Sequence, residues 1–439
     1  MRAEQPIATH QLGVWMTGGL VVGSMIGSGI FMLPVSLGPL GANAMVGWVI
    51  SILGALAIAF GLATLSRRGE GGIRAYIEPA FGPTAAFLVT WALWWSNIAA
   101  QAALAIATAS ALAWLFPWLG GAPWIVAVGV GCVLLLTLAN LRGVRTSGGL
   151  SLVTVAIKLI PLLAVVGIIF MRRVAGIPFE PLAHSPVTLP NIATATALTL
   201  FALTGFENAT APVDKVRDPA RTIPRALLVG TTLVGFIYLL SSSGVMLLLP
   251  ADRIAAAAAP YADVIALQWG QQAGILAAFA IAVSAFGALN CLIFGTGELA
   301  YAMGLRGDLP AVFASTGREN IPVVAHVVGG AMTISLILAN SSKATASLFT
   351  FVILLSTAAV LFVYALGALA AWKEDKSARS RTILVVALLF IVFAFYGAGL
   401  EADLWSLVLL AGGLALRFIL RLTAGSSPAV ETSPAAPRE

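Results

Sequence analysis

GSMIGSGIFMLP, residues 23–34, breaks the apolar pattern of the first long segment of the chain. Three glycines and two serines interrupt a long apolar segment here, and a proline closes the interruption. Irregular backbone at membrane depth is tolerated only where it lines a cavity or is buried in protein. A helix that breaks there exposes N–H groups at the positive end of its dipole, which suits a carboxylate. The stretch therefore predicts a membrane helix broken at a ligand site, although its spaced glycines also suit close helix packing.

The composition supports a membrane protein. Of the 439 residues, 59% are hydrophobic and 10% charged, and the mean hydropathy is +0.98, whereas about 25% of a soluble protein is charged. Two cysteines in apolar segments and three histidines without metal spacing predict no disulfide, metal or cofactor. A net charge of +6 fits basic cytoplasmic loops rather than nucleic-acid binding.

Twelve apolar windows are long enough to span the membrane, because about 20 helical residues cross a hydrocarbon core of about 30 Å. They are continuously apolar rather than alternating, which excludes a membrane β-barrel and predicts an all-α polytopic protein. The windows lie near residues 11–37, 42–66, 84–115, 122–141, 148–171, 191–212, 224–249, 272–303, 322–341, 345–372, 381–400 and 402–422.

Most of the 24 lysines and arginines fall on one set of alternate loops. The other set holds only Arg172, Arg173, Arg253 and Lys343, while Lys158 lies within a span. This bias predicts that both termini are cytoplasmic. The predicted organisation is a cytoplasmic N-terminus (1–10), a first five-helix repeat (11–171), a second five-helix repeat (191–372), helices 11 and 12 (381–422) and a disordered cytoplasmic tail (423–439).

A second interruption occurs at residues 198–212, LTLFALTGFENATAP, where we expect a break around 204–208. The two interrupted segments begin two successive sets of five spans, and broken helices at matching positions point to a transporter site. Carbonyls freed in one helix suit an ammonium group, and N–H groups freed in the other suit a carboxylate. A zwitterion fits between them.

Several motifs resemble those of the amino acid–polyamine–organocation permeases. They are GSMIGSGIFMLP, FALTGFENA, DKVRDPARTIPRA (214–226) and ELAYAMGLRGDLP (298–310), and WALWWSNIAAQ (91–101) looks like helix three of the bacterial arginine/agmatine antiporter branch. The resemblance implies a leucine-transporter-type fold, a 5+5 inverted repeat plus two helices, in which helices 1 and 6 are discontinuous. It also implies a transporter rather than an enzyme.

The resemblance further implies which residues bind substrate. Ser28 and Gly29 would hold a carboxylate, with the Met25 carbonyl nearby. The carbonyls of Phe201 and Thr204 would take an amine, and the Phe201 ring would gate the site.

The substrate side chain would face Asn97 and Leu292. At the positions of Leu292 and Phe201 the arginine antiporter branch has tryptophan, and leucine offers no face to a cation. Both departures favour a neutral substrate.

Two ionisable residues are candidates for coupling or gating. Lys158 lies midway along span 5, where a lysine costs about 2.5–3.5 kcal/mol on insertion scales. It either couples transport to protons, stands in for a sodium ion as in some relatives, or is a structural cation at the helix-1 break. Glu207 follows the helix-6 break and either organises the unwound backbone, gates the site or carries a proton.

The sequence therefore predicts a secondary active amino acid transporter that works by alternating access, proton-coupled and specific for neutral amino acids. The alternative is an exchanger for cationic amino acids or polyamines. Catalytic motifs such as HExxH and GxSxG, and the polar filters of channels, are not found in the sequence. We expect a bacterial inner-membrane location, with the lipid bilayer and an amino acid as partners, protons as a further partner, and a homodimer as an open alternative.

Overall fold

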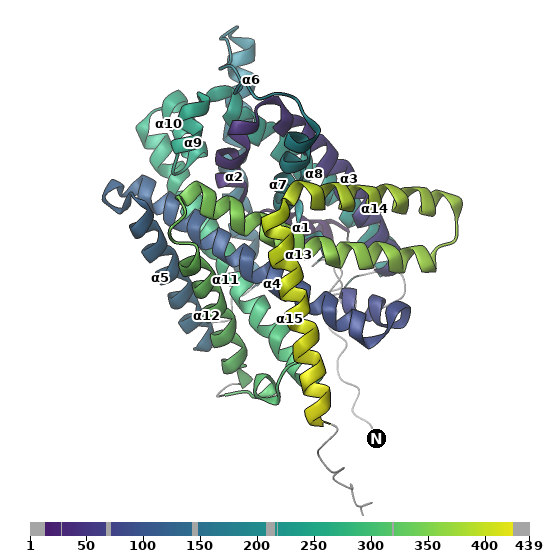
Figure 1. The fold of residues 1–439 in the computed structure, drawn as a ribbon. Coiled ribbons are helices and arrows are strands. Elements are labelled where there is room, and N and C mark those ends of the chain that lie inside the picture. Colours follow the sequence, from purple (N-terminus) through teal and green to yellow (C-terminus); the bar gives the residue numbers. More distant parts are fainter. Residues whose placement is uncertain are drawn as a thin grey trace, which may run out of the picture.

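The computed structural model describes residues 14–27, 29–66, 72–142, 148–207, 216, 218–317 and 320–424, and within these ranges it contains helices and no β-strand (Figure 1). The elements are α1 (Val14–Met25), α2 (Gly29–Leu37), η1 (Gly38–Leu40), α3 (Ala42–Ser66), α4 (Gly72–Leu115), η2 (Pro117–Leu119), α5 (Ala122–Leu141), α6 (Gly148–Val174), α7 (Leu189–Leu203), α8 (Pro219–Leu248), α9 (Ala251–Ala256), α10 (Pro260–Trp269), α11 (Gln271–Leu305), η5 (Ala311–Ala314), α12 (Val323–Ala339), α13 (Thr345–Glu374), α14 (Ala378–Ala398) and α15 (Leu400–Ala424).

Many of these helices are suited to a membrane. Among the described residues, eight are long and apolar enough to span it, and the bent pair α1–α2 makes a ninth candidate. The shorter helices α7 and α12 are also apolar. The prediction of a polytopic all-α membrane protein is therefore confirmed, while the count of twelve spans and the inverted repeat stay predictions.

The structure differs from the sequence expectation in three places. Helix α4 begins at Gly72 rather than near residue 84 and is kinked at Gly82, where φ is +83°. The short helices α9 and α10 occupy the expected loop between the spans at 224–249 and 272–303. Helix α15 continues to Ala424, so the expected tail begins later, and residues 1–10 and 425–439 lie outside the described part of the chain.

The helices around the two expected breaks pack closely on one another. Helix α3 packs against α7 and α8, and α4 packs against α11 and α13. A Cβ on Gly47 of α3 would lie 2.6 Å from the Cβ of Ala195 of α7, so only glycine lets these two helices approach this closely. Ser51 of α3 completes the contact through hydrogen bonds to the Thr196 carbonyl and the Thr199 hydroxyl.

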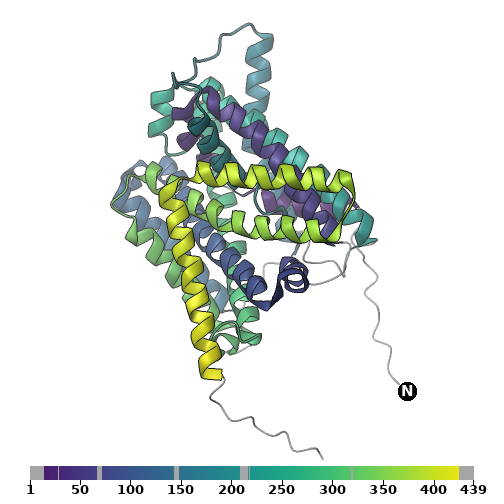
Figure 2. The same ribbon diagram turned by 45° about the vertical axis from the view of Figure 1, so that its right-hand side comes forward.

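The last two helices form an outer layer. In both ribbon views α13 and α14 run side by side, and α15 crosses them at a steep angle (Figures 1 and 2). The chain turns between α14 and α15 at Gly399, where φ is +84°. Helix α15 is held to α4 by the Trp91 indole, which donates to the Leu409 carbonyl at 2.7 Å.

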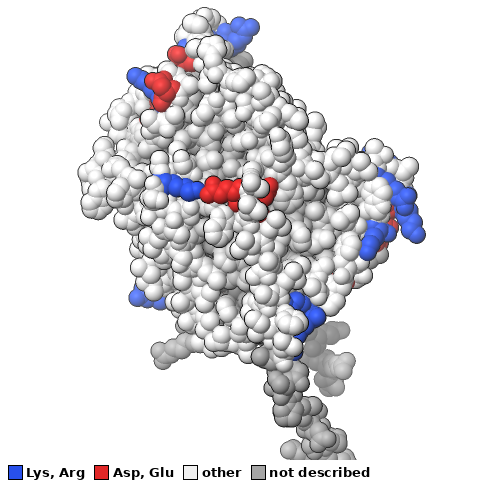
Figure 3. Space-filling model, in the orientation of Figure 1, with Lys and Arg blue, Asp and Glu red and all other residues white. Residues whose placement is uncertain are grey.

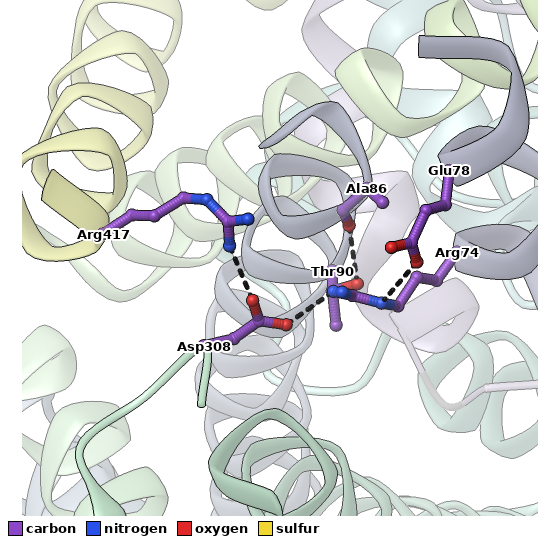
Figure 4. Close-up of polar contacts among 6 residues, drawn as sticks. All are labelled: Arg74, Glu78, Ala86, Thr90, Asp308 and Arg417. Atoms are coloured by element: carbon purple, nitrogen blue, oxygen red, sulfur yellow. Dashed lines mark hydrogen bonds and ion pairs between the residues drawn. The ribbon is translucent and has the colours of Figure 1, made fainter. Parts of the chain in front are cut away.

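A buried carboxylate joins three distant segments on the predicted cytoplasmic side. Asp308, which follows α11, accepts a hydrogen bond from Arg74 of α4 and another from Arg417 of α15, each at 2.6 Å (Figure 4). Arg74 also contacts Glu78 at 3.5 Å, and the Arg417 guanidinium lies 4.9 Å from the ring centre of Phe87. These contacts fix the first turns of α4 against the end of α15.

Candidate substrate site at the two helix breaks

The first break separates α1 from α2. Helix α1 ends at Met25, α2 begins at Gly29, and the axes of 17–25 and 29–40 differ by 46°. The Met25 carbonyl accepts hydrogen bonds from the Gly27 N–H at 2.7 Å and from the Tyr238 hydroxyl of α8 at 3.1 Å. The break expected within residues 23–29 is therefore present, and Ser28 lies outside the described residues.

The second break follows α7. That helix ends at Leu203, Thr204 is extended, and Gly205 has a φ of +106°, which favours glycine. The Glu207 carboxylate accepts the Gly205 N–H at 3.0 Å, so an acid two residues later satisfies a backbone donor that the helix has released. The end of α7 agrees with the expected break, and residues 208–215 lie outside the described part.

The two breaks are in direct contact. The Ser24 hydroxyl donates to the Gly205 carbonyl at 3.0 Å and to the Val21 carbonyl at 2.9 Å. A Cβ on Gly205 would lie 2.7 Å from the Ser24 carbonyl oxygen, closer than carbon and oxygen can pack. Glycine at 205 is thus required both by its backbone angle and by the approach of α1.

Phe201 lies against the beginning of α2. A Cβ on Gly29 would lie 2.6 Å from Cε1 of the Phe201 ring, so the aromatic side chain covers the N-terminus of α2. The Phe201 carbonyl accepts bonds from the N–H and hydroxyl of Thr204, at 3.2 and 2.7 Å. The carbonyl that we expected to take an amine is therefore engaged within its own turn in this conformation.

Glu207 is held from a second direction by α13. The Tyr364 hydroxyl donates to the Glu207 carboxylate at 2.8 Å, and the Phe206 ring stacks on the Tyr364 ring with centroids 5.4 Å apart. Glu207 and Tyr364 are both buried. This arrangement supports the structural interpretation of Glu207, because its carboxylate orders the unwound backbone of α7 and attaches it to α13.

Lys158 is buried in α6, which packs against α11. Helix α6 also contacts α1. No hydrogen bond or ion pair joins Lys158 to another residue in the described part of the chain. The lysine thus places a buried amine among α6, α11 and the helix that carries the first break.

Asn97 and Leu292 lie on α4 and α11, which pack on each other. Both are half-buried, and in the described part of the chain no side-chain hydrogen bond joins either of them to Phe201 or Gly29. The Leu292 carbonyl instead accepts a bond from Gln101, four residues after Asn97, at 3.3 Å.

Gln101 is a polar residue that the sequence analysis did not select. Its amide donates to Thr296 of α11 at 2.7 Å and accepts from Thr333 of α12 at 3.0 Å. Tyr238 was missed in the same way. In each case the sequence signal is a polar or phenolic group within an apolar span, where it needs a partner.

Comparison with known proteins agrees with the motifs. The amino acid permease family model matches residues 12–411. The chain is 26% identical to the putrescine transporter PotE of Escherichia coli K12 over 412 residues, which covers 90% of this chain and 93% of that protein. PotE of Haemophilus influenzae is likewise 26% identical over 411 residues, with coverage of 90% and 94%. The cadaverine/lysine antiporter of E. coli K12 is 29% identical over 360 residues, with coverage of 77% and 78%. Because the family model covers nearly the whole membrane region, the chain belongs to the amino acid permease family, and its similarities lie with the basic amino acid and polyamine antiporter branch that the motifs indicated.

Proposed function

We propose that this protein exchanges a cationic amino acid for an amine across the bacterial inner membrane. The observation that carries the proposal is the similarity over 90% of the chain to a putrescine transporter and over 77% to a cadaverine/lysine antiporter. These relatives favour the exchanger alternative over the neutral, proton-coupled carrier that the sequence analysis put first.

The geometry of the breaks is compatible with such a substrate. The N-terminus of α2 at Gly29 offers backbone N–H groups to an α-carboxylate. The resemblance assigns Ser28 and the Met25 carbonyl to the same end of the substrate. Phe201 covers this end, as a gate over a bound substrate would. For an amine without a carboxylate, the carbonyls of the broken helices are the acceptors, with those of Phe201 and Thr204 the first candidates.

Alternating access requires the site to open to one side at a time. We propose that α1 and α2 rock against α4 and α13, and that the Ser24–Gly205 contact keeps the two breaks together during this motion. We propose that the Lys158 side chain takes the place where sodium-coupled carriers hold an ion, so exchange needs no coupling ion. Asn97 and Leu292 would then face the side chain of the substrate from α4 and α11.

A neutral amino acid remains the second candidate, because Leu292 and Phe201 stand where the resemblance places tryptophan. A competition experiment separates the two. Purified protein is given radiolabelled lysine and increasing concentrations of unlabelled cadaverine, putrescine, arginine or leucine. We expect cadaverine and putrescine to displace lysine, with leucine without effect. Displacement by leucine alone would refute the cationic substrate class.

A second experiment tests the site itself. Leu292→Trp should strengthen lysine binding by about tenfold, since a cation on an aromatic face gains 0.5–2 kcal/mol. The matched control is Leu276→Trp on the same helix, where the side chain is exposed and a tryptophan fits without overpacking the core. Equal effects of the two substitutions would remove Leu292 from the proposed site.

A further inference from the structure

Lys343 and Glu401 form an ion pair at the rim of a cavity whose lining does not include Gly29, Phe201 or Gly205. The cavity has a volume of about 570 Å³. Its walls are the second half of α2, the beginning of α13 and the junction of α14 with α15, and α9 contributes Ala255. The distribution of lysines and arginines assigns this end of the molecule to the outside.

The position of the Lys343 ammonium indicates what the cavity recognises. Its Nζ lies 2.8 Å from Oε1 of Glu401 and 4.2 Å from the centre of the Phe351 ring. A carboxylate and an aromatic face on two sides of a cation are the recognised means of binding ammonium groups. The Lys343 side chain ends in a primary ammonium group, and the backbone to which it is attached keeps this group beside the cavity.

The remaining walls are mainly apolar, as the alkyl chain of an amine requires, and carry three hydroxyl groups. The hydroxyls of Ser36 in α2 and Thr350 in α13 are hydrogen-bonded at 2.7 Å, and Ser347 also lines the cavity. The Glu401 side chain is 63% exposed, so solutes reach the carboxylate without a rearrangement. Figure 3 shows this short run of basic and acidic side chains near the beginnings of α13 and α15, on a face that is otherwise largely uncharged.

We propose that this cavity is a second binding site, specific for a primary alkylammonium group, and that Lys343 occupies it as a tethered competitor. The ligand is either a soluble amine such as a diamine or the ammonium of a phosphatidylethanolamine headgroup. The proposal rests on the contacts of Lys343 and is independent of which substrate binds between the helix breaks.

The attachment of Lys343 beside the cavity determines how tightly we expect a free amine to bind there. A side chain attached beside its site acts at a millimolar effective concentration, so removing it should lower the amine concentration needed for occupancy by about tenfold. Removing the carboxylate should abolish the preference for an ammonium, because the aromatic face alone holds a solvated cation weakly.

The test uses a reporter in the cavity wall. Ser347→Cys is introduced into the full chain after Cys132→Ala and Cys291→Ala, and the protein is reconstituted in phosphatidylcholine nanodiscs. The rate at which a neutral maleimide modifies the new thiol is measured with and without cadaverine.

The variants are Lys343→Met, Glu401→Gln and the double variant. Lys373→Met is the matched control, because Lys373 also lies over an aromatic ring, that of Phe81 at 3.9 Å, at the other end of α13. If Ser347→Cys prevents folding, Ala255→Cys, at an exposed position that also lines the cavity, replaces it as the reporter.

We expect cadaverine to slow modification at least about threefold in Lys343→Met, at concentrations without effect on the reporter protein alone or with Lys373→Met. Adding Glu401→Gln should abolish the protection. If phosphatidylethanolamine in the nanodisc slows the reaction in Lys343→Met and cadaverine adds nothing, the headgroup is the source of the ammonium. The proposal is overturned if neither amine slows modification in Lys343→Met, or if protection persists in the double variant. Because the reporter reads this cavity alone, failure of lysine–cadaverine exchange would leave the result unaffected.

Discussion

Ser24 donates a hydrogen bond to the carbonyl of Gly205 at 3.0 Å, although 181 residues separate them. This bond connects the break after α1 with the break after α7. On the other side of the same peptide segment, Glu207 accepts the Gly205 N–H and the Tyr364 hydroxyl. A continuous set of hydrogen bonds thus runs from α1 through the unwound end of α7 to α13.

The contact at Gly205 predicts that Gly205→Ala abolishes transport. The added Cβ would lie 2.7 Å from the Ser24 carbonyl oxygen at a backbone angle of +106°, so α1 must move away. Strain of this kind costs about 1–3 kcal/mol before the steric clash is added. Exchange in proteoliposomes and thermal stability in detergent are the measurements.

Gly270→Ala is the matched control for this prediction. Gly270 has a similar φ of +91°, yet a Cβ there would meet no atom within 4 Å. It should lose stability through backbone strain alone and retain exchange. If both variants transport equally, the contact between the breaks has no part in the cycle.

Tyr364→Phe should slow exchange while leaving the protein folded. The substitution keeps the stack on Phe206 but removes one donor from a buried carboxylate, which costs about 1–3 kcal/mol. Because that donor helps to hold the unwound end of α7, we expect the turnover rate to fall by more than lysine affinity. Tyr396→Phe, on the exposed surface of α14, is the control and should change neither. A Tyr364→Phe variant with normal turnover would show that the attachment of Glu207 to α13 has no part in the transport cycle.

Asp308→Asn should destabilise the protein strongly. The carboxylate is buried between Arg74 and Arg417, and removing one partner of a buried ionic group costs about 3–5 kcal/mol. Asp218→Asn is the comparison, because Asp218 and Arg221 form an exposed pair at 3.8 Å, which we expect to contribute about 0–1 kcal/mol. Thermal unfolding in detergent measures both, and equal small losses would contradict the role of Asp308.

The short helix α10 should be more stable in mild acid. Burial raises the pKa of Asp263 above its usual 3.8, against the opposing effects of the Trp114 hydrogen bond and nearby Arg253. The folded state therefore binds the proton more tightly than the unfolded state, so this stability is present below pH 3.8 and is lost as pH rises through the raised pKa. Asp263→Asn should remove this dependence. Hydrogen exchange of residues 260–269 measures this stability between about pH 3.5 and 7, the range in which carboxyl groups titrate. If Asp263→Asn shows the same pH profile as the native protein, Asp263 is not the cause.

Much of the fold follows from local sequence. Continuous apolar windows locate most of the long helices, and Gly27 and Gly29 mark a break that local backbone freedom explains. The early start of α4 is less visible, since Pro79, Gly82 and Pro83 read as a loop. The segment before the kink at Gly82 is helical, and its Arg74 pairs with Asp308, more than two hundred residues away, a contact that no local pattern shows.

The site is predictable only in part for the same reason. Phe201 and Glu207 stand out by motif, and the structure places both at the second break. Tyr238 and Gln101 do not stand out, because their importance depends on a carbonyl or hydroxyl from another helix. Long-range hydrogen bonds of this kind are set by helix packing, which a local pattern does not encode.

Counterflow in proteoliposomes tests the central claim most directly. Vesicles are loaded with cadaverine, leucine or buffer, radiolabelled lysine is added outside, and uptake is followed with and without an imposed pH gradient, for the native chain and for Lys158→Met. We predict rapid uptake by the native chain only into vesicles that contain cadaverine, whatever the gradient, and a loss of this exchange in Lys158→Met. Uptake into buffer-loaded vesicles that an inward proton gradient drives, and that leucine outside inhibits, would contradict the exchanger and support a proton-coupled carrier of neutral amino acids.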